Sequence, residues 1–112
     1  MSAITLTFIG GGNMARSLIA GLVRQGVAPA HIHVAEPVTE LREQLTADFG
    51  VKTYASATEA AAQGEVWVLA VKPQVLRDVC ASLVPLAGAR QPLVVSIAAG
   101  ITSAQLERWL GG

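Results

Sequence analysis

One stretch near the start of the chain limits the possible folds more than any other. Between residues 4 and 23, an apolar run is followed by a glycine-rich turn and then by an amphipathic segment. The turn, residues 10–15, reads G-G-G-N-M-A and fits the pattern G-x-G-x-x-G/A. The apolar run predicts a buried strand, and the apolar spacing after the turn predicts a helix. This order is typical of a dinucleotide-binding unit, the alternative being a plain strand–turn–helix junction.

Each small residue of the turn has its own part in this prediction. Gly10 would allow the tight exit from the strand, Gly12 would let a pyrophosphate approach the backbone, and Ala15 would let the helix lie against the strand. The helix would then present free N–H groups and the positive end of its dipole to the phosphates. Asn13 could also be a simple helix cap, a role compatible with phosphate binding.

The rest of the chain alternates strand and helix patterns over 112 residues, which suits one domain. The composition is 52% hydrophobic and 14% charged, as expected for parallel strands that are covered on both faces. The expected strands are 4–9, 31–36, 51–54, 66–71 and 93–97. Helices are expected over 13–25, 56–64 and 102–110. A further helix is expected to be capped by Thr39 and to end before Gly50, and another is expected to start at Pro73 and to be ended by Pro85 and Gly88.

This alternation, with its short connections, predicts an α/β fold. We expect a doubly wound, Rossmann-like parallel sheet with strand order 3-2-1-4-5 and helices on both faces. A ligand should lie at the carboxyl ends of the strands, at the switch between the first and fourth strands. Four segments converge there: 10–15, 36–37, 70–73 and 97–100.

Two charged residues lie at this edge of the predicted sheet. Glu36 ends the second strand, near the place where an acid accepts a hydrogen bond from the ribose 2′-OH. A carboxylate there would repel a 2′-phosphate and so favours NAD over NADP; the alternative is a solvent-facing acid before Pro37. Lys72 could contact a ribose or phosphate, or could simply be solvated.

Other residues that could carry chemistry are expected to be structural. His31 and His33 alternate on a strand without further metal ligands nearby, so we expect surface or packing roles and no metal site. Cys80 and Trp67 are expected in the core. No catalytic residue is identified in these 112 residues.

Charge and hydropathy exclude several classes of partner. The formal net charge is zero and no basic cluster occurs, so nucleic acid is not an expected partner. The longest uncharged stretch, 91–106, is interrupted by Pro92 and Gly100, so no membrane span is expected. No signal peptide is recognised, and the single cysteine suits a reducing compartment. The cytoplasm is the expected location.

Three motifs together resemble a known family. They are F-I-G-G-G-N-M-A at 8–15, L-A-V-K-P-Q at 69–74, and S-I-A-A-G-I-T at 96–102 with L-E-R-W-L after it. Over essentially its whole length the chain resembles the N-terminal domain of pyrroline-5-carboxylate reductase. The resemblance implies an oxidoreductase of proline biosynthesis that transfers hydride from NAD(P)H to the imine 1-pyrroline-5-carboxylate.

The resemblance also implies a domain organisation. Residues 1–112 would form the dinucleotide-binding domain, without the family's C-terminal helical domain that dimerises and builds the substrate pocket. The chain alone is then expected to be inactive and to expose an apolar edge, while the full-length form would be a homo-oligomer. Two alternatives stay open: a stand-alone nucleotide-binding or sensing module without catalysis, and the cofactor half of another Rossmann reductase, such as a β-hydroxyacid or deazaflavin-dependent enzyme.

The motif and the resemblance together give the expected site for NADP or NAD. Many relatives have serine, asparagine or arginine near Glu36, which suits a 2′-phosphate, and this chain departs from them. The expected cofactor-binding residues are Ile9, Gly10, Gly11, Gly12, Asn13, Met14, Ala15, Glu36, Ala70, Val71, Lys72, Pro73, Ile97, Ala98 and Ala99.

Overall fold

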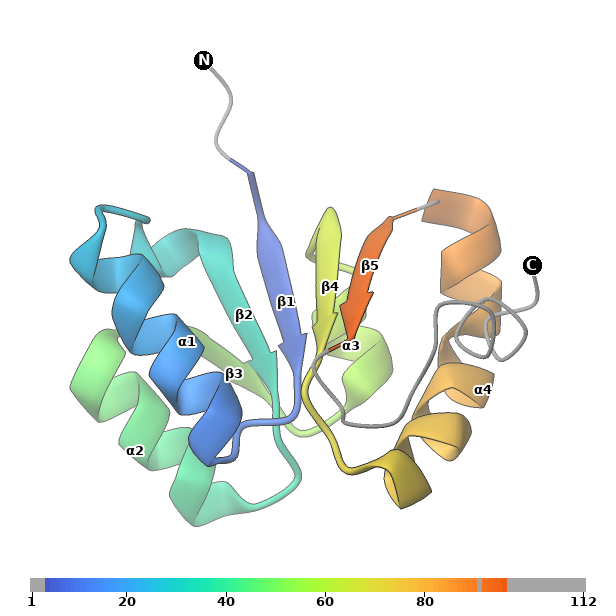
Figure 1. Cartoon of the computed structure of the whole chain (residues 1–112), viewed down its shortest axis with the longest axis horizontal. Coiled ribbons are helices and arrows are strands. Elements are labelled where there is room, and N and C mark those ends of the chain that lie inside the picture. Colours follow the sequence, from blue (N-terminus) through green and yellow to red (C-terminus); the bar gives the residue numbers. More distant parts are fainter. Residues whose placement is uncertain (1–3, 91, 97–112) are drawn as a thin grey trace.

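Five parallel strands form one sheet in the computed structural model, which describes residues 4–90 and 92–96 (Figure 1). The strands are β1 (Leu6–Ile9), β2 (Ile32–Ala35), β3 (Lys52–Tyr54), β4 (Val66–Leu69) and β5 (Leu93–Ser96). The helices are α1 (Asn13–Arg24), the 3₁₀ turn η1 (Pro29–His31), α2 (Thr39–Phe49), α3 (Ala57–Ala61) and α4 (Pro73–Arg90). The strand order β3-β2-β1-β4-β5 confirms the predicted topology.

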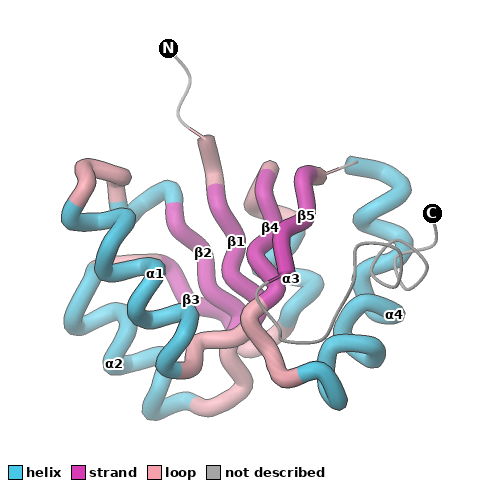
Figure 2. The backbone as a smooth tube through the Cα atoms, viewed as in Figure 1, coloured by secondary structure: helices cyan, strands magenta, loops and turns pink. Residues whose placement is uncertain are grey.

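Helices cover both faces of the sheet, as a doubly wound fold requires. Successive residues of a strand point to opposite faces, so Phe8 packs with α1 and α2 while Ile9 packs with α3 and α4. Figure 2 shows α1 on the near side of the sheet and α3 behind it. The split follows from right-handed crossovers, because the chain winds from β1 toward β3 in one direction and from β4 to β5 in the other.

Two side chains from the sheet fix the short helix α3. Thr7 donates its hydroxyl to the carbonyl of Ala60 (2.8 Å), and Trp67 donates its indole N–H to the carbonyl of Ala61 (3.0 Å). All four residues are fully buried. The expectation that Trp67 belongs to the core is therefore confirmed, and its indole N–H provides a hydrogen-bond donor for a carbonyl at the end of α3.

Several helix boundaries differ from those predicted. Helix α3 ends at Ala61, where the sequence predicted a helix over 56–64. Helix α4 continues through Pro85 to Arg90, although proline was expected to end it. A proline inside a helix removes one backbone hydrogen bond, but Leu83 is fully buried on the preceding turn, and Leu86 packs against the same core. Helix α2 has Val38 as its N-cap residue, without a side-chain cap, so Thr39 does not take the capping role.

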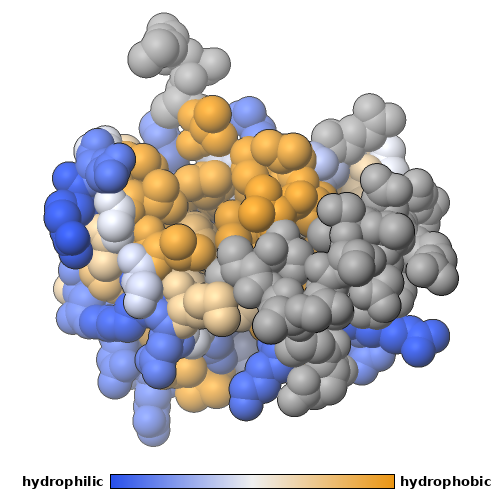
Figure 3. Space-filling model, viewed as in Figure 1, coloured by the Kyte–Doolittle hydropathy of each residue, from blue (hydrophilic) through white to orange (hydrophobic). Residues whose placement is uncertain are grey.

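Apolar side chains gather on the face seen in Figure 3, over the upper parts of β1, β4 and β5. Ile4, Leu93 and Val95 are 60%, 66% and 42% exposed. Strand β5 is the last strand of the described sheet, and α1 and α2 lie on the other side of β1 from it. Apolar side chains are therefore exposed on this face of the described residues, and whether they form the expected apolar edge stays a prediction.

Hydropathy adds one further finding. Among the helices of residues 4–90, none combines the length and apolar character that crossing a membrane requires.

Candidate functional site

The glycine-rich turn leaves β1 through a position that only glycine fits. Gly10 has φ +108°, and a Cβ there would lie 2.8 Å from the carbonyl oxygen of Ala70. Two backbone bonds of 2.8 Å hold the strand ends around it, from Gly10 N–H to the Ala35 carbonyl and from Ala70 N–H to the Ile9 carbonyl. The turn therefore begins between the carboxyl ends of β2 and β4, where the topology reverses direction.

The next glycine faces open space at the start of α1. Gly12 is the N-cap residue, and a Cβ built on it meets no atom within 4 Å. No side chain caps this helix and no acid lies in its first turn, so the cap role considered for Asn13 is wrong. The first N–H groups of a helix have no partner inside it, and they carry its positive dipole end. Ala15 is fully buried against the sheet, as its small size predicts.

A cleft of about 740 Å³ lies at this edge of the sheet. Its volume falls within the range that small-molecule and cofactor sites occupy. Its lining comes from the strand ends, the glycine-rich turn, the loop between β3 and α3, the first residue of α3 and the first turns of α4. The lining residues are Ile9, Gly10, Gly11, Gly12, Asn13, Met14, Ala35, Glu36, Pro37, Ala55, Ala57, Ala70, Val71, Lys72, Val75 and Val79.

Most of the expected cofactor-binding residues meet in this cleft, from the glycine-rich turn, the end of β2 and the end of β4. Ala15 packs in the core and does not line the cleft, and Pro73 is the first residue of α4. Ile97, Ala98 and Ala99 lie outside the described residues. Lys72 is exposed at the rim, where it leads into α4.

The expected cofactor-binding set left out some residues of the cleft. Ala55 and Ala57 follow β3, whose carboxyl end lies at the same edge of the sheet as those of β1 and β2. That rule was applied to the other strands and would also have found these alanines. Val75 and Val79 were expected on the apolar face of a helix, and their i, i+4 spacing places both on the cleft side of α4.

Glu36 is buried, with 6% of its surface exposed, so it is not a solvent-facing acid. One carboxylate oxygen accepts the N–H of Gly11 and the other accepts the N–H of Val38, both at 2.9 Å. Arg42 also donates to the backbone carbonyl of Glu36, at 2.7 Å. Each carboxylate oxygen can accept more than one hydrogen bond, so a ribose hydroxyl could still be received.

His33 has a packing role away from the cleft. Its Nδ1 lies 2.9 Å from the Tyr54 hydroxyl, and the imidazole is nearly fully buried. Burial lowers the pKa of His33, and the nearby charges of Lys52 and His31 lower it further. Among the described residues, no group of three histidine, cysteine or acidic side chains is placed to hold a metal ion.

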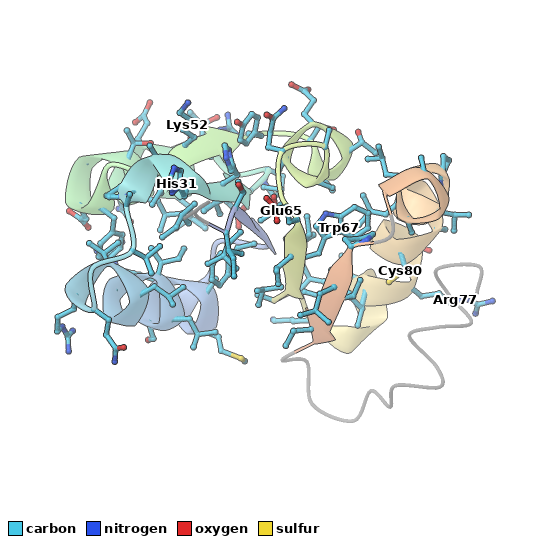
Figure 4. The ribbon with its side chains drawn as sticks, turned by 90° about the horizontal axis from the view of Figure 1, so that it is seen from above. His31, Lys52, Glu65, Trp67, Arg77 and Cys80 are labelled. Atoms are coloured by element: carbon cyan, nitrogen blue, oxygen red, sulfur yellow. The ribbon has the colours of Figure 1, made fainter. Side chains whose placement is uncertain are left out.

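Cys80 is a residue of α4 that packs in the core with residues of the sheet, close to Trp67 in the view from above (Figure 4). The thiol is fully buried, and burial raises its pKa. A raised pKa disfavours the thiolate, which is the nucleophilic form. The expected core role is confirmed.

Comparisons with known proteins agree with this geometry. Residues 5–100 match the model of the family described as "NADP oxidoreductase coenzyme F420-dependent". The chain is 48% identical over 111 residues to a pyrroline-5-carboxylate reductase of Pseudomonas aeruginosa, an alignment that covers 99% of this chain and 40% of that protein.

Two solved structures have the same fold. The pyrroline-5-carboxylate reductase of Coxiella burnetii matches with a TM-score of 0.94 and 36% identity, over 98% of this chain and 41% of that one. The Plasmodium falciparum enzyme, solved with NADP bound, matches with a TM-score of 0.83 and 24% identity, over 100% of this chain and 40% of that one. The resemblance stated from the sequence motifs is thus confirmed, and the chain spans about 40% of the curated relative's length.

Proposed function

The chain belongs to the family described as "NADP oxidoreductase coenzyme F420-dependent", and on that premise we propose that it is the coenzyme-binding part of a pyrroline-5-carboxylate reductase. The proposed reaction is the NAD(P)H-dependent reduction of 1-pyrroline-5-carboxylate to L-proline, a step of proline biosynthesis. Relatives named for this activity, 48% and 36% identical to the chain, support the proposal.

The open space at Gly12 is the observation that carries the proposal. It lies where an uncapped helix N-terminus, the glycine-rich turn and a cleft of about 740 Å³ coincide. Two linked phosphates suit such a place, because backbone N–H groups and a positive dipole end favour negative charge.

The residues present fit a nicotinamide dinucleotide. The N–H groups near Gly12, Asn13 and Met14 would bind the diphosphate, and the adenosine would lie toward Glu36. Ala70, Val71 and Lys72 line the cleft on the β4 side. When bound, the coenzyme supplies the hydride, and the chain binds it, orients it and excludes water. Ile97, Ala98 and Ala99 are proposed on the resemblance alone.

The remaining functions of the relatives are proposed to lie outside this chain. We propose residues 1–112 as the dinucleotide-binding domain, with the imine pocket and the contacts of a homo-oligomer supplied by the part of the relatives that it does not span. We also propose a cytoplasmic location, because a sequence with one cysteine forms no internal disulfide.

Titration with NADH and NADPH, followed by nicotinamide or tryptophan fluorescence, tests coenzyme binding. We expect saturation, and we expect Gly12→Ala to weaken binding by at least about tenfold while changing the free energy of unfolding by about 1 kcal/mol or less. Gly21→Ala, at another open glycine of α1, is the matched control and should leave the affinity unchanged. Absence of saturation by either coenzyme would remove the binding proposal.

Catalysis separates this proposal from a sensing module. The whole protein should oxidise NADH or NADPH only when 1-pyrroline-5-carboxylate is added, with L-proline as product. A protein that binds the coenzyme and shows no such turnover would instead be a nucleotide-binding module.

A further inference from the structure

Glu36 links two loops that lie at the same end of the cleft. We propose that it is a positioning residue, whose carboxylate ties the glycine-rich turn to the segment before α2 and thereby holds the diphosphate-binding backbone in shape for either coenzyme. The proposal rests on the proposed function, since it assigns Glu36 a part in binding the diphosphate of NADH and NADPH alike. It differs from the sequence hypothesis, in which Glu36 recognises the ribose and selects the coenzyme.

The two hydrogen bonds of the carboxylate carry this inference. Oε1 accepts the N–H of Gly11 at 2.9 Å, and Oε2 accepts the N–H of Val38 at 2.9 Å. Bonds to an ionised carboxylate are about twice as strong as neutral ones. Since Gly11 lies between the two glycines of the motif, fixing its N–H fixes the path of the turn.

Packing around Gly11 supports the same role. A Cβ at Gly11 would lie 2.9 Å from Leu45 Cδ1 and 3.1 Å from Glu36 Cβ. The motif accepts any residue at this middle position, so the fingerprint itself does not require the glycine. In this chain the absent side chain lets the stem of Glu36 pass directly against the turn.

Glu36 is itself held from a third side. Arg42 Nη1 donates to the backbone carbonyl of Glu36 at 2.7 Å, and Arg42 Nη2 donates to the Thr39 hydroxyl at 3.0 Å. The end of β2 is therefore anchored to α2, and the carboxylate extends that anchor to the phosphate-binding turn. A side chain with both oxygens engaged by backbone N–H groups is fixed before any ligand arrives.

Affinities of Glu36 variants for the two coenzymes distinguish positioning from ribose recognition. We expect Glu36→Ala to weaken the binding of NADH and of NADPH in parallel, each by roughly tenfold, so that the ratio of the two affinities stays constant within about twofold. The affinities of Glu36→Gln should lie between those of the wild type and of Glu36→Ala, because the amide offers one acceptor oxygen where the carboxylate offers two. Glu40→Gln, an exposed acid in the first turn of α2, is the matched control and should bind as the wild type does.

Amide hydrogen exchange gives a second measurement that does not depend on a ligand. In the Glu36 variants, the N–H groups of Gly11 and Val38 should exchange faster, while those of β1 and β4 keep their protection. Preserved protection in the strands shows that the variant is folded, so a loss of affinity then reports on the turn.

The outcomes separate this inference from the proposed function. A change in the NADPH/NADH ratio with unchanged NADH affinity would overturn the positioning role and assign Glu36 to the ribose. Unchanged exchange at Gly11 and Val38 would also overturn it. If the wild-type protein bound neither coenzyme, the proposed function would fall and the coenzyme part of this inference with it, while the exchange data would still decide whether the tie exists.

Discussion

His33 is a single residue whose burial makes stability depend on pH. Burial lowers its pKa, and Lys52 and His31 lower it further, while the ring nitrogen contacts the Tyr54 hydroxyl. Below about pH 6.5 the unfolded chain binds a proton at this imidazole more readily than the folded chain does. Stability therefore falls as the pH drops below that value.

Urea unfolding of the wild type and of His33→Gln at about pH 8 and about pH 5.5 tests this dependence. The wild type should lose more free energy of unfolding between the two pH values than the variant does. An equal loss in both proteins would show that groups other than His33 are responsible.

Residues that act through local backbone geometry were predictable from the sequence. Gly10 and Ala15 follow from the turn pattern alone, because a tight exit and close helix packing are local requirements. The setting of Glu36 was not predictable in the same way, since its carboxylate is bound to a residue 25 positions away. Contacts of that kind depend on how strands and loops come together.

Among the elements, α3 depends most on its neighbours. It has five residues, which is too short for a helix that is stable by itself. Ser56 accepts the N–H of Glu59 at its start, and Trp67 and Thr7 donate to its final carbonyls. The sequence pattern predicted that a helix begins at residue 56, whereas the end of α3 is held by side chains of β1 and β4.

Removing one of these bonds should loosen α3. Trp67→Phe leaves the Ala61 carbonyl buried without the indole donor, and we expect a loss of about 1–3 kcal/mol in the free energy of unfolding. Thr7→Val keeps the shape and removes the other donor, with a similar expected effect. Denaturant unfolding measures both, and stability equal to that of the wild type would contradict the role given to these bonds.

The order of the elements was predictable because periodicity and connection rules act along the whole chain. Short apolar strands alternating with helices and right-handed crossovers leave few arrangements, and the observed β3-β2-β1-β4-β5 is the expected one. The end of α4 was not predictable from the sequence. Whether Pro85 ends the helix depends on how firmly the neighbouring turns pack against the core.

At the scale of the whole molecule, the exposed apolar side chains and the cleft lie on different parts of the sheet. On the face seen in Figure 3, apolar side chains gather over β1, β4 and β5. Leu93 and Val95 of β5 are among the exposed apolar residues of the described chain. The cleft lies at the carboxyl ends of the strands and includes neither of these side chains. Surface properties and coenzyme binding should therefore respond to different substitutions.

The double variant Leu93→Thr, Val95→Thr tests this separation. Threonine keeps β propensity while it lowers the apolar area, so the 112-residue chain should bind less of a hydrophobic dye such as ANS and self-associate less at high concentration. Val84→Thr changes an exposed apolar residue of α4 and is the control, for which a smaller effect is expected. The affinity for NADH and NADPH should stay within about twofold of the wild type in both variants. A parallel loss of dye binding and of coenzyme affinity would mean that the apolar face and the cleft are one coupled surface.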